Sequence, residues 1–221
     1  MSIKKDQGSK YRVRRLFKPL VLKIAKLFVK MNISANIISL LGFIVCITAS
    51  AVFAFLDFWF ISILFGSLVF IAGLLDGVDG AVARLTNTAS PFGGLLDSVS
   101  DRFADTFLYL GFFKYYYFQN ILQTNFYNWL NDLIVLSIPI YIWVALAIIG
   151  TISVSYSRTL AEKYIKDYNC DIGLAGRSER LFILAIASWC LIPCLGLVVL
   201  TIISFLTAIY RQIKYGLIIK K

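Results

Sequence analysis

The 221-residue sequence contains no histidine, few cysteines and little charge. Without histidine, imidazole acid–base catalysis and every histidine-ligated metal site are excluded. The four cysteines, which include no C-x-x-C pair, predict neither a zinc site nor a disulfide framework: Cys46, Cys170, Cys190 and Cys194. Charged residues make up only 15% of the chain and hydrophobic residues 59%, a composition typical of a polytopic membrane protein.

Six apolar runs follow a basic amphipathic segment, and each is long enough, or nearly so, to cross a membrane as a helix. The predicted fold class is an all-α integral membrane protein with six transmembrane helices preceded by an interfacial amphipathic helix. We expect disorder over residues 1–10, the juxtamembrane amphipathic helix over 11–31 and the transmembrane catalytic domain over 32–221. The predicted spans are 34–56, 58–84, 93–113, 133–157, 181–195 and 196–213.

A net charge of +10 suggests a nucleic-acid partner until the basic residues are located. With six spans, 21 of the 22 Lys and Arg residues share the side of the two termini, and Lys114 alone lies on the other side. The positive-inside rule therefore predicts a multi-pass cell-membrane protein with both termini in the cytoplasm. We expect membrane lipid as the partner of this charge and no nucleic acid. No signal peptide is expected, because a basic region of about thirty residues precedes the first apolar run.

Two stripes of small and acidic residues lie at the predicted cytoplasmic ends of the second and third spans. The first stripe falls within roughly 100° of arc on a helix and consists of Asp76, Asp79, Gly80 and Ala83. The second stripe repeats every four residues and consists of Gly93, Asp97, Asp101 and Asp105. Ionisable residues beside a membrane core indicate a functional site, because their burial there is costly.

Packed side by side, the two helices would direct four carboxylates into one cavity, where they would repel one another strongly. Mg²⁺ or Mn²⁺ would remove this repulsion, because both ions prefer carboxylate oxygen, and the spacing suits one or two ions. Arg84 borders the first stripe and supplies a fixed cation suited to phosphate. A site open to cytosol and lipid together indicates a nucleotide-activated lipid or a polyprenyl diphosphate as substrate.

The spacing D-x2-D-G-x2-A-R-x8-G-x3-D-x3-D, from Asp76 to Asp101, resembles the complete signature of the CDP-alcohol phosphotransferase family. The six spans after a juxtamembrane helix also resemble the layout of this family. The segment before the first span is similar to the Thr-Pro-Asn sequence of the family, with Ser34-Ala35 in place of Thr-Pro, and Asn36 is therefore a further candidate residue.

The resemblance implies that a CDP-lipid donates its phosphatidyl-type group to an acceptor hydroxyl and that CMP leaves. It implies two metal ions on Asp76, Asp79, Asp97 and Asp101, with Asp101 also acting as the general base. It places the CDP-lipid against Asp76, Asp79, Gly80, Ala83, Arg84 and Gly93, and it implies a homodimer. Asp105 lies outside the signature, so a direct role and a supporting role both stay open.

The segment 155–180 is predicted to choose the acceptor, because it faces the cytosol beside the acidic stripes. Arg158, Arg177 and Arg180 could grip a phosphate, although the positive-inside rule alone also accounts for them. The S-Y-x-R and G-R-x-E-R runs in this segment resemble phosphatidylinositol-phosphate and archaetidylinositol-phosphate synthases, whereas Leu160 replaces a basic residue common there. Inositol 1-phosphate is therefore the favoured acceptor, and glycerol 3-phosphate or another alcohol such as serine is the alternative.

Two other classes of protein use clustered membrane aspartates. Intramembrane aromatic prenyltransferases bind Mg²⁺ through paired Asp motifs but lack the D-G-x2-A-R pattern. A divalent-cation transporter would distribute its acids through the depth of the membrane, whereas these acids cluster at one end beside an arginine. The sequence does not distinguish an ester-linked diacylglycerol donor from an ether-linked archaeol donor, because apolar helices accommodate both.

Overall fold

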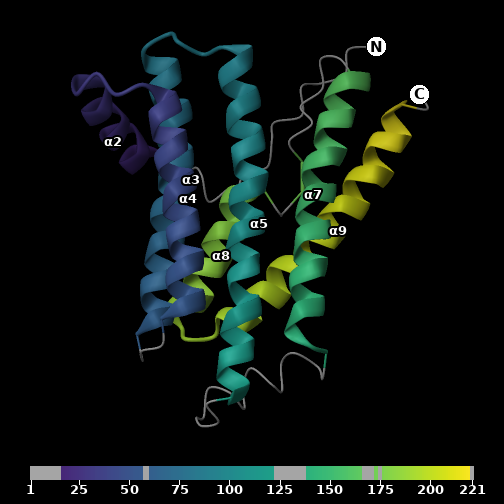
Figure 1. The fold of residues 1–221 in the computed structure, drawn as a ribbon. Coiled ribbons are helices and arrows are strands. Elements are labelled where there is room, and N and C mark those ends of the chain that lie inside the picture. The colour runs from purple at the N-terminus through teal and green to yellow at the C-terminus, as the bar shows by residue number, and fades with distance from the viewer. Residues whose placement is uncertain (1–15, 57–59, 122–137, 166–171, 174–175, 220–221) are drawn as a thin grey trace.

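The computed structural model describes residues 16–56, 60–121, 138–165, 172–173 and 176–219, and its regular elements there are all helices. They form one elongated bundle (Figure 1). In chain order the helices are α2 (Lys18–Lys30), α3 (Ala35–Phe55), α4 (Ile61–Leu85), α5 (Pro91–Ile121), α7 (Ile140–Tyr164), α8 (Arg177–Trp189) and α9 (Pro193–Ile219).

Six of these helices occupy the positions of the six predicted spans. Among the described residues, α3, α4, α7 and α9 are long and apolar enough to cross a membrane. The charged second stripe interrupts the apolar character of α5, and α8 has 13 residues. A helix of that length extends about 20 Å, which is shorter than a hydrocarbon core of about 30 Å. The all-helical membrane fold is thus confirmed with four candidate spans, and the count of six remains a prediction.

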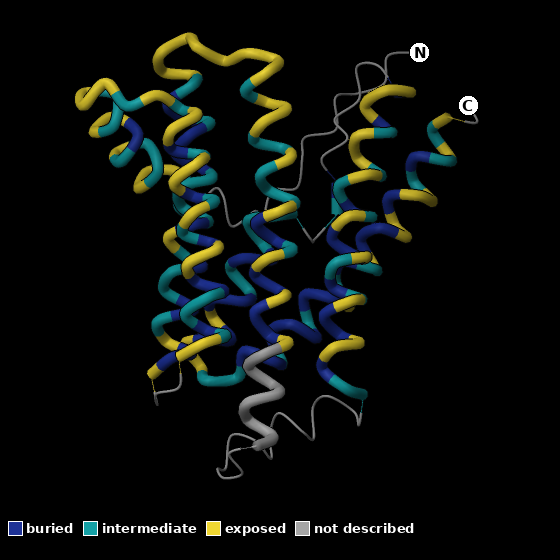
Figure 2. Tube along the Cα trace, in the orientation of Figure 1, coloured by how far each residue is buried: buried dark blue, intermediate teal, exposed yellow. Residues whose placement is uncertain are grey.

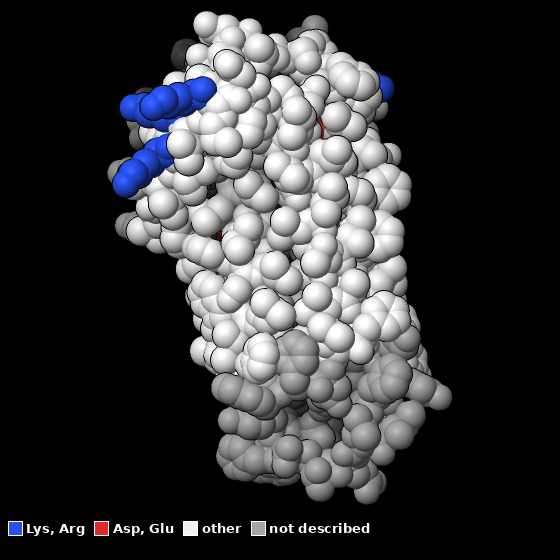
Figure 3. Space-filling model, turned by 60° about the vertical axis from the view of Figure 1, so that its left-hand side comes forward, with Lys and Arg blue, Asp and Glu red and all other residues white. Residues whose placement is uncertain are grey.

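The helix α2 lies within the predicted amphipathic segment 11–31 and packs on α4. Its buried Ala25 contacts a small apolar cluster that includes Val78 and Val82 of α4. Its lysines are all exposed. The basic atoms visible in Figure 3 gather at the upper end of the molecule. Residues 1–10, for which disorder is predicted, lie outside the described residues, and the membrane-surface position of α2 remains a prediction.

The main core lies where α3, α4 and α5 meet and continues to α8 and α9. Phe53 of α3 stacks on Phe65 of α4 with ring centroids 4.3 Å apart, and Phe112 of α5 lies 5.0 Å from Phe53. Each of these three rings is fully buried. This aromatic contact joins α4 and α5 to α3, so the two acidic stripes lie on helices that share α3 as a neighbour.

A glycine lets α8 approach α4 closely. A Cβ atom added to Gly66 would lie 2.8 Å from the carbonyl oxygen of Ala185 and 2.8 Å from Cβ of Ser188. A side chain at this position would therefore push the two helices apart. The close packing brings Arg177, the first residue of α8, beside Asp76 of α4.

One end of the bundle is loosely packed. Along α5, burial begins only at Ala104, and residues 86–90 before the helix are all exposed. Figure 1 shows this α4–α5 connection and the end of α9 at one end of the bundle, and the α8–α9 turn at the opposite end. In Figure 2 the buried positions are denser toward the end that holds the α8–α9 turn. Asp97 and Asp101, which precede Ala104 in α5, therefore lie in an open part of the fold.

Candidate active site

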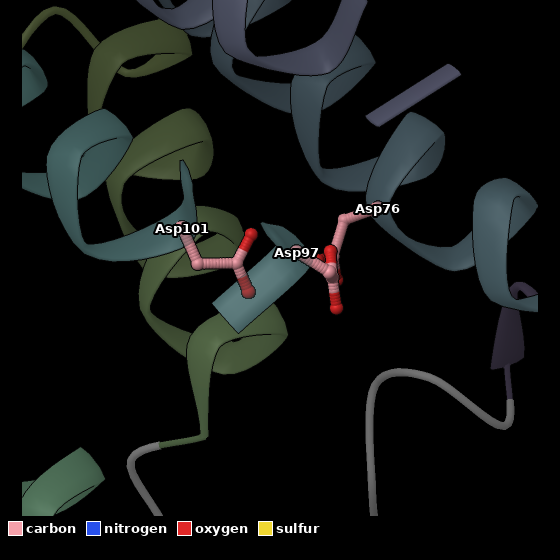
Figure 4. A group of neighbouring side chains, drawn as sticks. All are labelled: Asp76, Asp97 and Asp101. Atoms are coloured by element: carbon pink, nitrogen blue, oxygen red, sulfur yellow. The ribbon is translucent and has the colours of Figure 1, made fainter. Parts of the chain in front are cut away.

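The two acidic stripes face each other across the space between α4 and α5, which both pack on α3. One carboxylate oxygen from each of Asp76, Asp97 and Asp101 lies within 4.8 Å of the other two. Figure 4 shows these side chains directed into a common space, Asp76 from α4 and the other two from α5. Because Asp97 and Asp101 are four residues apart, one helix turn stacks both carboxylates on the same face.

The residues of this cluster fit a hard divalent cation. The donors are carboxylate oxygens, which Mg²⁺ and Mn²⁺ prefer, and one oxygen from each of three side chains could reach a single ion. A cavity of about 10 Å³ lies among the four signature aspartates, which is roughly the space that one water molecule needs. The structure thus supports use of a divalent metal at this point.

Asp79 stands slightly apart from the other three aspartates. Its Oδ2 accepts a hydrogen bond of 2.7 Å from the hydroxyl of Ser39, and its Oδ1 accepts one from the backbone N–H of Gly80. The side chain is buried and lies outside the three-residue cluster. Its predicted role as a metal ligand stays a prediction.

A cavity of about 480 Å³ lies on one side of the aspartates. It is bounded by the start of α3, the end of α4 and the start of α5, and it collects every residue that the sequence assigned to the CDP-lipid except Asp76. Gly93 forms part of its wall, and a Cβ atom there would lie 3.5 Å from Oδ1 of Asn36. The predicted residues that line this cavity are Asn36, Asp79, Gly80, Ala83, Arg84, Gly93 and Asp97.

A second cavity, of about 400 Å³, lies on the other side and contains all three predicted acceptor arginines. Its six guanidinium groups belong to Arg84, Arg102, Arg158, Arg177, Arg180 and Arg211. Its seven carboxylates are the four signature aspartates with Asp105, Glu162 and Glu179. Asp79, Gly80, Arg84 and Asp97 line both cavities, so the two spaces meet at the acidic cluster.

The predicted acceptor arginines differ in their surroundings. Arg158 of α7 is exposed and pairs with Glu162 one turn away at 2.8 Å. Arg177 of α8 pairs with Asp76 and with Asp101, the latter at 2.5 Å, and thus reaches into the acidic cluster.

Asp105 joins the two arginines of α8. One carboxylate oxygen lies 3.3 Å from Nε of Arg177, and the other accepts a hydrogen bond of 2.7 Å from Arg180. Both Asp105 and Arg180 are buried, with 2% and 3% of their surface exposed. Sequence reasoning left the role of Asp105 open, and the structure brings it together with the predicted acceptor arginines.

Ser39 and Arg211 line the two cavities but were not predicted from the sequence. Arg211 is buried, and its guanidinium donates to the carbonyl oxygens of Ile172, at 2.7 Å, and of Val154. It thereby holds residue 172, just before α8, against α7 and α9. An arginine within the apolar pattern of the last span was an available signal, whereas a single serine in an apolar run offered none.

The fold is similar to that of solved structures from Mycobacterium tuberculosis. Phosphatidylinositol phosphate synthase from this organism with CDP-DAG bound has a TM-score of 0.67 at 20% identity, with 89% of this chain and 94% of that chain covered. The structure of the same protein in complex with manganese and citrate also has a TM-score of 0.67 at 20% identity, over 89% of this chain and 88% of that chain. At this identity the likeness shows a shared fold.

Sequence comparison identifies the family. The chain is 31% identical to archaetidylinositol phosphate synthase of Pyrococcus horikoshii, over 90% of this chain and 93% of the relative. It is 30% identical to archaetidylinositol phosphate synthase of Methanothermobacter thermautotrophicus, over 91% of this chain and 89% of that relative. Residues 32–210, which hold both acidic stripes, match the sequence profile of CDP-alcohol phosphatidyltransferases. The resemblance found in the spacing of the aspartates is therefore confirmed, and the chain belongs to the CDP-alcohol phosphatidyltransferase family.

Proposed function

We propose that this protein transfers the phosphatidyl-type group of a CDP-lipid to the hydroxyl of inositol 1-phosphate and releases CMP. The observation that carries the proposal is the pair of cavities that meet at the signature aspartates, one with the donor residues of the family and one rich in arginine. Two relatives similar over nine-tenths of the chain are archaetidylinositol phosphate synthases, which supports a phosphorylated inositol as acceptor.

The larger cavity suits the cytidine diphosphate part of the donor. Gly80 and Gly93 have no side chain and Ala83 has only a methyl group, so a bulky nucleotide can approach the helix backbones at this cavity. Arg84 lies at the point where both cavities meet and offers a cation to the diphosphate. The lipid tails, of diacylglycerol or archaeol, would extend into the membrane beside the apolar helices.

Divalent cations, Mg²⁺ or Mn²⁺ and two in number, would be held by Asp76, Asp79, Asp97 and Asp101 and would neutralise charge on the diphosphate and the leaving CMP. Asp101 acts as the general base that takes the proton of the acceptor hydroxyl. As the acceptor oxygen forms its bond to the lipid-side phosphorus, the bond from that phosphorus to the bridging oxygen of CMP breaks. Arg177 and Arg180, with Arg158 at the rim, hold the phosphate of the acceptor.

The membrane topology follows from the distribution of the basic residues. We propose that α5 and α8 complete a set of six membrane helices, with both termini and the active site on the cytoplasmic side. This position lets a soluble acceptor and a membrane-embedded donor meet at one site. A homodimer is proposed from the resemblance to the family.

The test is release of CMP by the purified protein in detergent with Mg²⁺ or Mn²⁺, with separate diacylglycerol and archaeol CDP-lipids as donors. Inositol 1-phosphate, glycerol 3-phosphate, serine and free inositol are compared as acceptors. We expect product only with a phosphorylated acceptor and the highest kcat/KM with inositol 1-phosphate. Preference for glycerol 3-phosphate would establish the alternative acceptor, and preference for serine or free inositol would overturn the phosphate-binding assignment.

A further inference from the structure

Arg177 belongs to two groups of residues at once. Its Nη1 contacts Asp76 and Asp101, which are members of the cluster that fits a metal ion, whereas its Nε faces Asp105 at 3.3 Å. Among these carboxylate partners in the described part of the chain, Asp105 alone lies outside that cluster. The side chain therefore bridges the acidic cluster and the arginine-rich cavity.

A divalent cation on the cluster competes with Arg177 for the same oxygens. The carboxylate oxygens of Asp76 and Asp101 that would bind the ion are within reach of the guanidinium, and two cations cannot share them without strong repulsion. The contact with Asp105 does not compete, because Asp105 reaches Arg177 through a different nitrogen. Metal binding would thus release one side of the guanidinium and leave the other side held.

The charge of the arginine-rich cavity favours the same outcome. Its seven carboxylates and six guanidinium groups give a formal charge of −1, which disfavours a phosphate. Two divalent cations would bring the formal charge to +3, and the cavity would then attract an anion. Metal and acceptor phosphate are therefore expected to bind cooperatively.

We infer that Asp105 is a positioning residue for the acceptor phosphate. It anchors Arg177 through Nε and Arg180 through its terminal nitrogen, so that Arg177 turns from the acidic cluster to the acceptor when divalent cations bind. Asp105 touches neither the reacting atoms nor the metal cluster and acts through the two arginines. The inference rests on the proposed function, in which these arginines hold the phosphate of the acceptor.

The first test measures the coupling between metal and anion without turnover. Mn²⁺ is titrated onto the full chain in detergent, with free Mn²⁺ followed by electron paramagnetic resonance and no CDP-lipid present. The titration is repeated with inorganic phosphate, with inositol 1-phosphate and with free inositol, each corrected by a protein-free titration. We expect both phosphate compounds to tighten Mn²⁺ binding by about fivefold or more and free inositol to have no effect. Equal Mn²⁺ affinity with and without phosphate would overturn the inference.

The second test uses variants of Asp105. Asp105→Asn keeps the size of the side chain but removes its charge, so we expect the coupling to vanish and KM for inositol 1-phosphate to rise about tenfold or more. KM for the CDP-lipid is expected to stay within about twofold, and Asp105→Glu should restore part of the coupling. If Asp105→Asn does not fold, the Mn²⁺ titrations of Asp105→Glu and of the wild-type protein still test the inference.

Ser50→Ala is the matched structural control. It removes another polar contact of α5, a 2.6 Å hydrogen bond from Ser50 of α3 to the carbonyl oxygen of Phe107, and neither residue lines either cavity. We expect lower thermal stability with normal coupling and normal KM values. Equal effects of Ser50→Ala and Asp105→Asn on acceptor KM would overturn the positioning role.

The two proposals fail in different ways. Coupling to inorganic phosphate without turnover of inositol 1-phosphate would contradict the proposed acceptor and leave the positioning role supported. Turnover of inositol 1-phosphate by a protein whose Mn²⁺ affinity is the same with and without phosphate would support the proposed acceptor and contradict the positioning role of Asp105.

Discussion

Asp101→Asn should abolish lipid transfer while the protein stays folded. The amide has nearly the same shape as the carboxylate but neither accepts the proton of the acceptor hydroxyl nor contributes negative charge to the cluster. Loss of a general base lowers the rate by about 10²- to 10⁴-fold, or about 3–5 kcal/mol of barrier. The weaker hold on divalent cations adds to this loss, so we expect a fall in kcat of about a thousandfold or more.

The surroundings of Asp101 predict that stability changes little. Its side chain is 23% exposed, and it shares Arg177 with Asp76 and Asp105, which remain to hold the guanidinium. The substitution also removes one of three negative charges whose oxygens lie within 4.8 Å of one another. The lost ion pair and the relieved repulsion oppose each other, so the free energy of unfolding should change by about 1 kcal/mol or less.

The assay is release of CMP under saturating substrates and metal, with thermal unfolding in detergent as the measure of folding. Asp105→Asn is the matched comparison, because it makes the same chemical change one turn further along α5 and should raise acceptor KM instead of lowering kcat. Wild-type turnover of Asp101→Asn would refute its role as the base. Unfolding of this variant would refute the reasoning about stability.

Three further predictions concern the metal, the donor cavity and the helix packing. Chelation by EDTA should stop CMP release, and Mg²⁺ or Mn²⁺ should restore it; activity that survives chelation and dialysis would contradict the metal requirement. Ser39→Ala removes the 2.7 Å hydrogen bond to Asp79. In steady-state kinetics it should raise KM for the CDP-lipid about tenfold without changing KM for the acceptor. An unchanged KM for the CDP-lipid would exclude a role of Ser39 in positioning Asp79. Gly66→Ala places a methyl group 2.8 Å from Ala185 and Ser188 and should lower the free energy of unfolding by about 1–3 kcal/mol, measured by thermal unfolding. Gly216→Ala is the control, because a Cβ there meets nothing within 4 Å. Equal effects of the two variants would refute the packing argument.

The pairing of the acidic stripes was predictable because it depends on local periodicity. Asp97 and Asp101 share a face on any α-helix, and the short connection between the two helices makes them neighbours along the chain. The contacts of Arg177 and Asp105 were not predictable, because these residues are 72 positions apart in sequence. The packing of α8 against α4, which Gly66 permits, places Arg177 within reach of Asp105 on α5.

The sequence by itself determined the helical membrane fold, the family and the set of aspartates, because hydropathy, charge and helical spacing are properties of neighbouring residues. One expectation was less exact, because the span predicted over 181–195 is a 13-residue helix that begins at Arg177. The start predicted at residue 133 for the fourth span lies outside the described residues and remains a prediction. Only the tertiary structure decided that Arg177 bridges the acidic cluster and the arginine-rich cavity, that Ser39 binds Asp79 and that Arg211 holds residue 172. Each of these contacts joins residues at least 39 positions apart in sequence, and its geometry depends on how side chains pack between the elements that carry them.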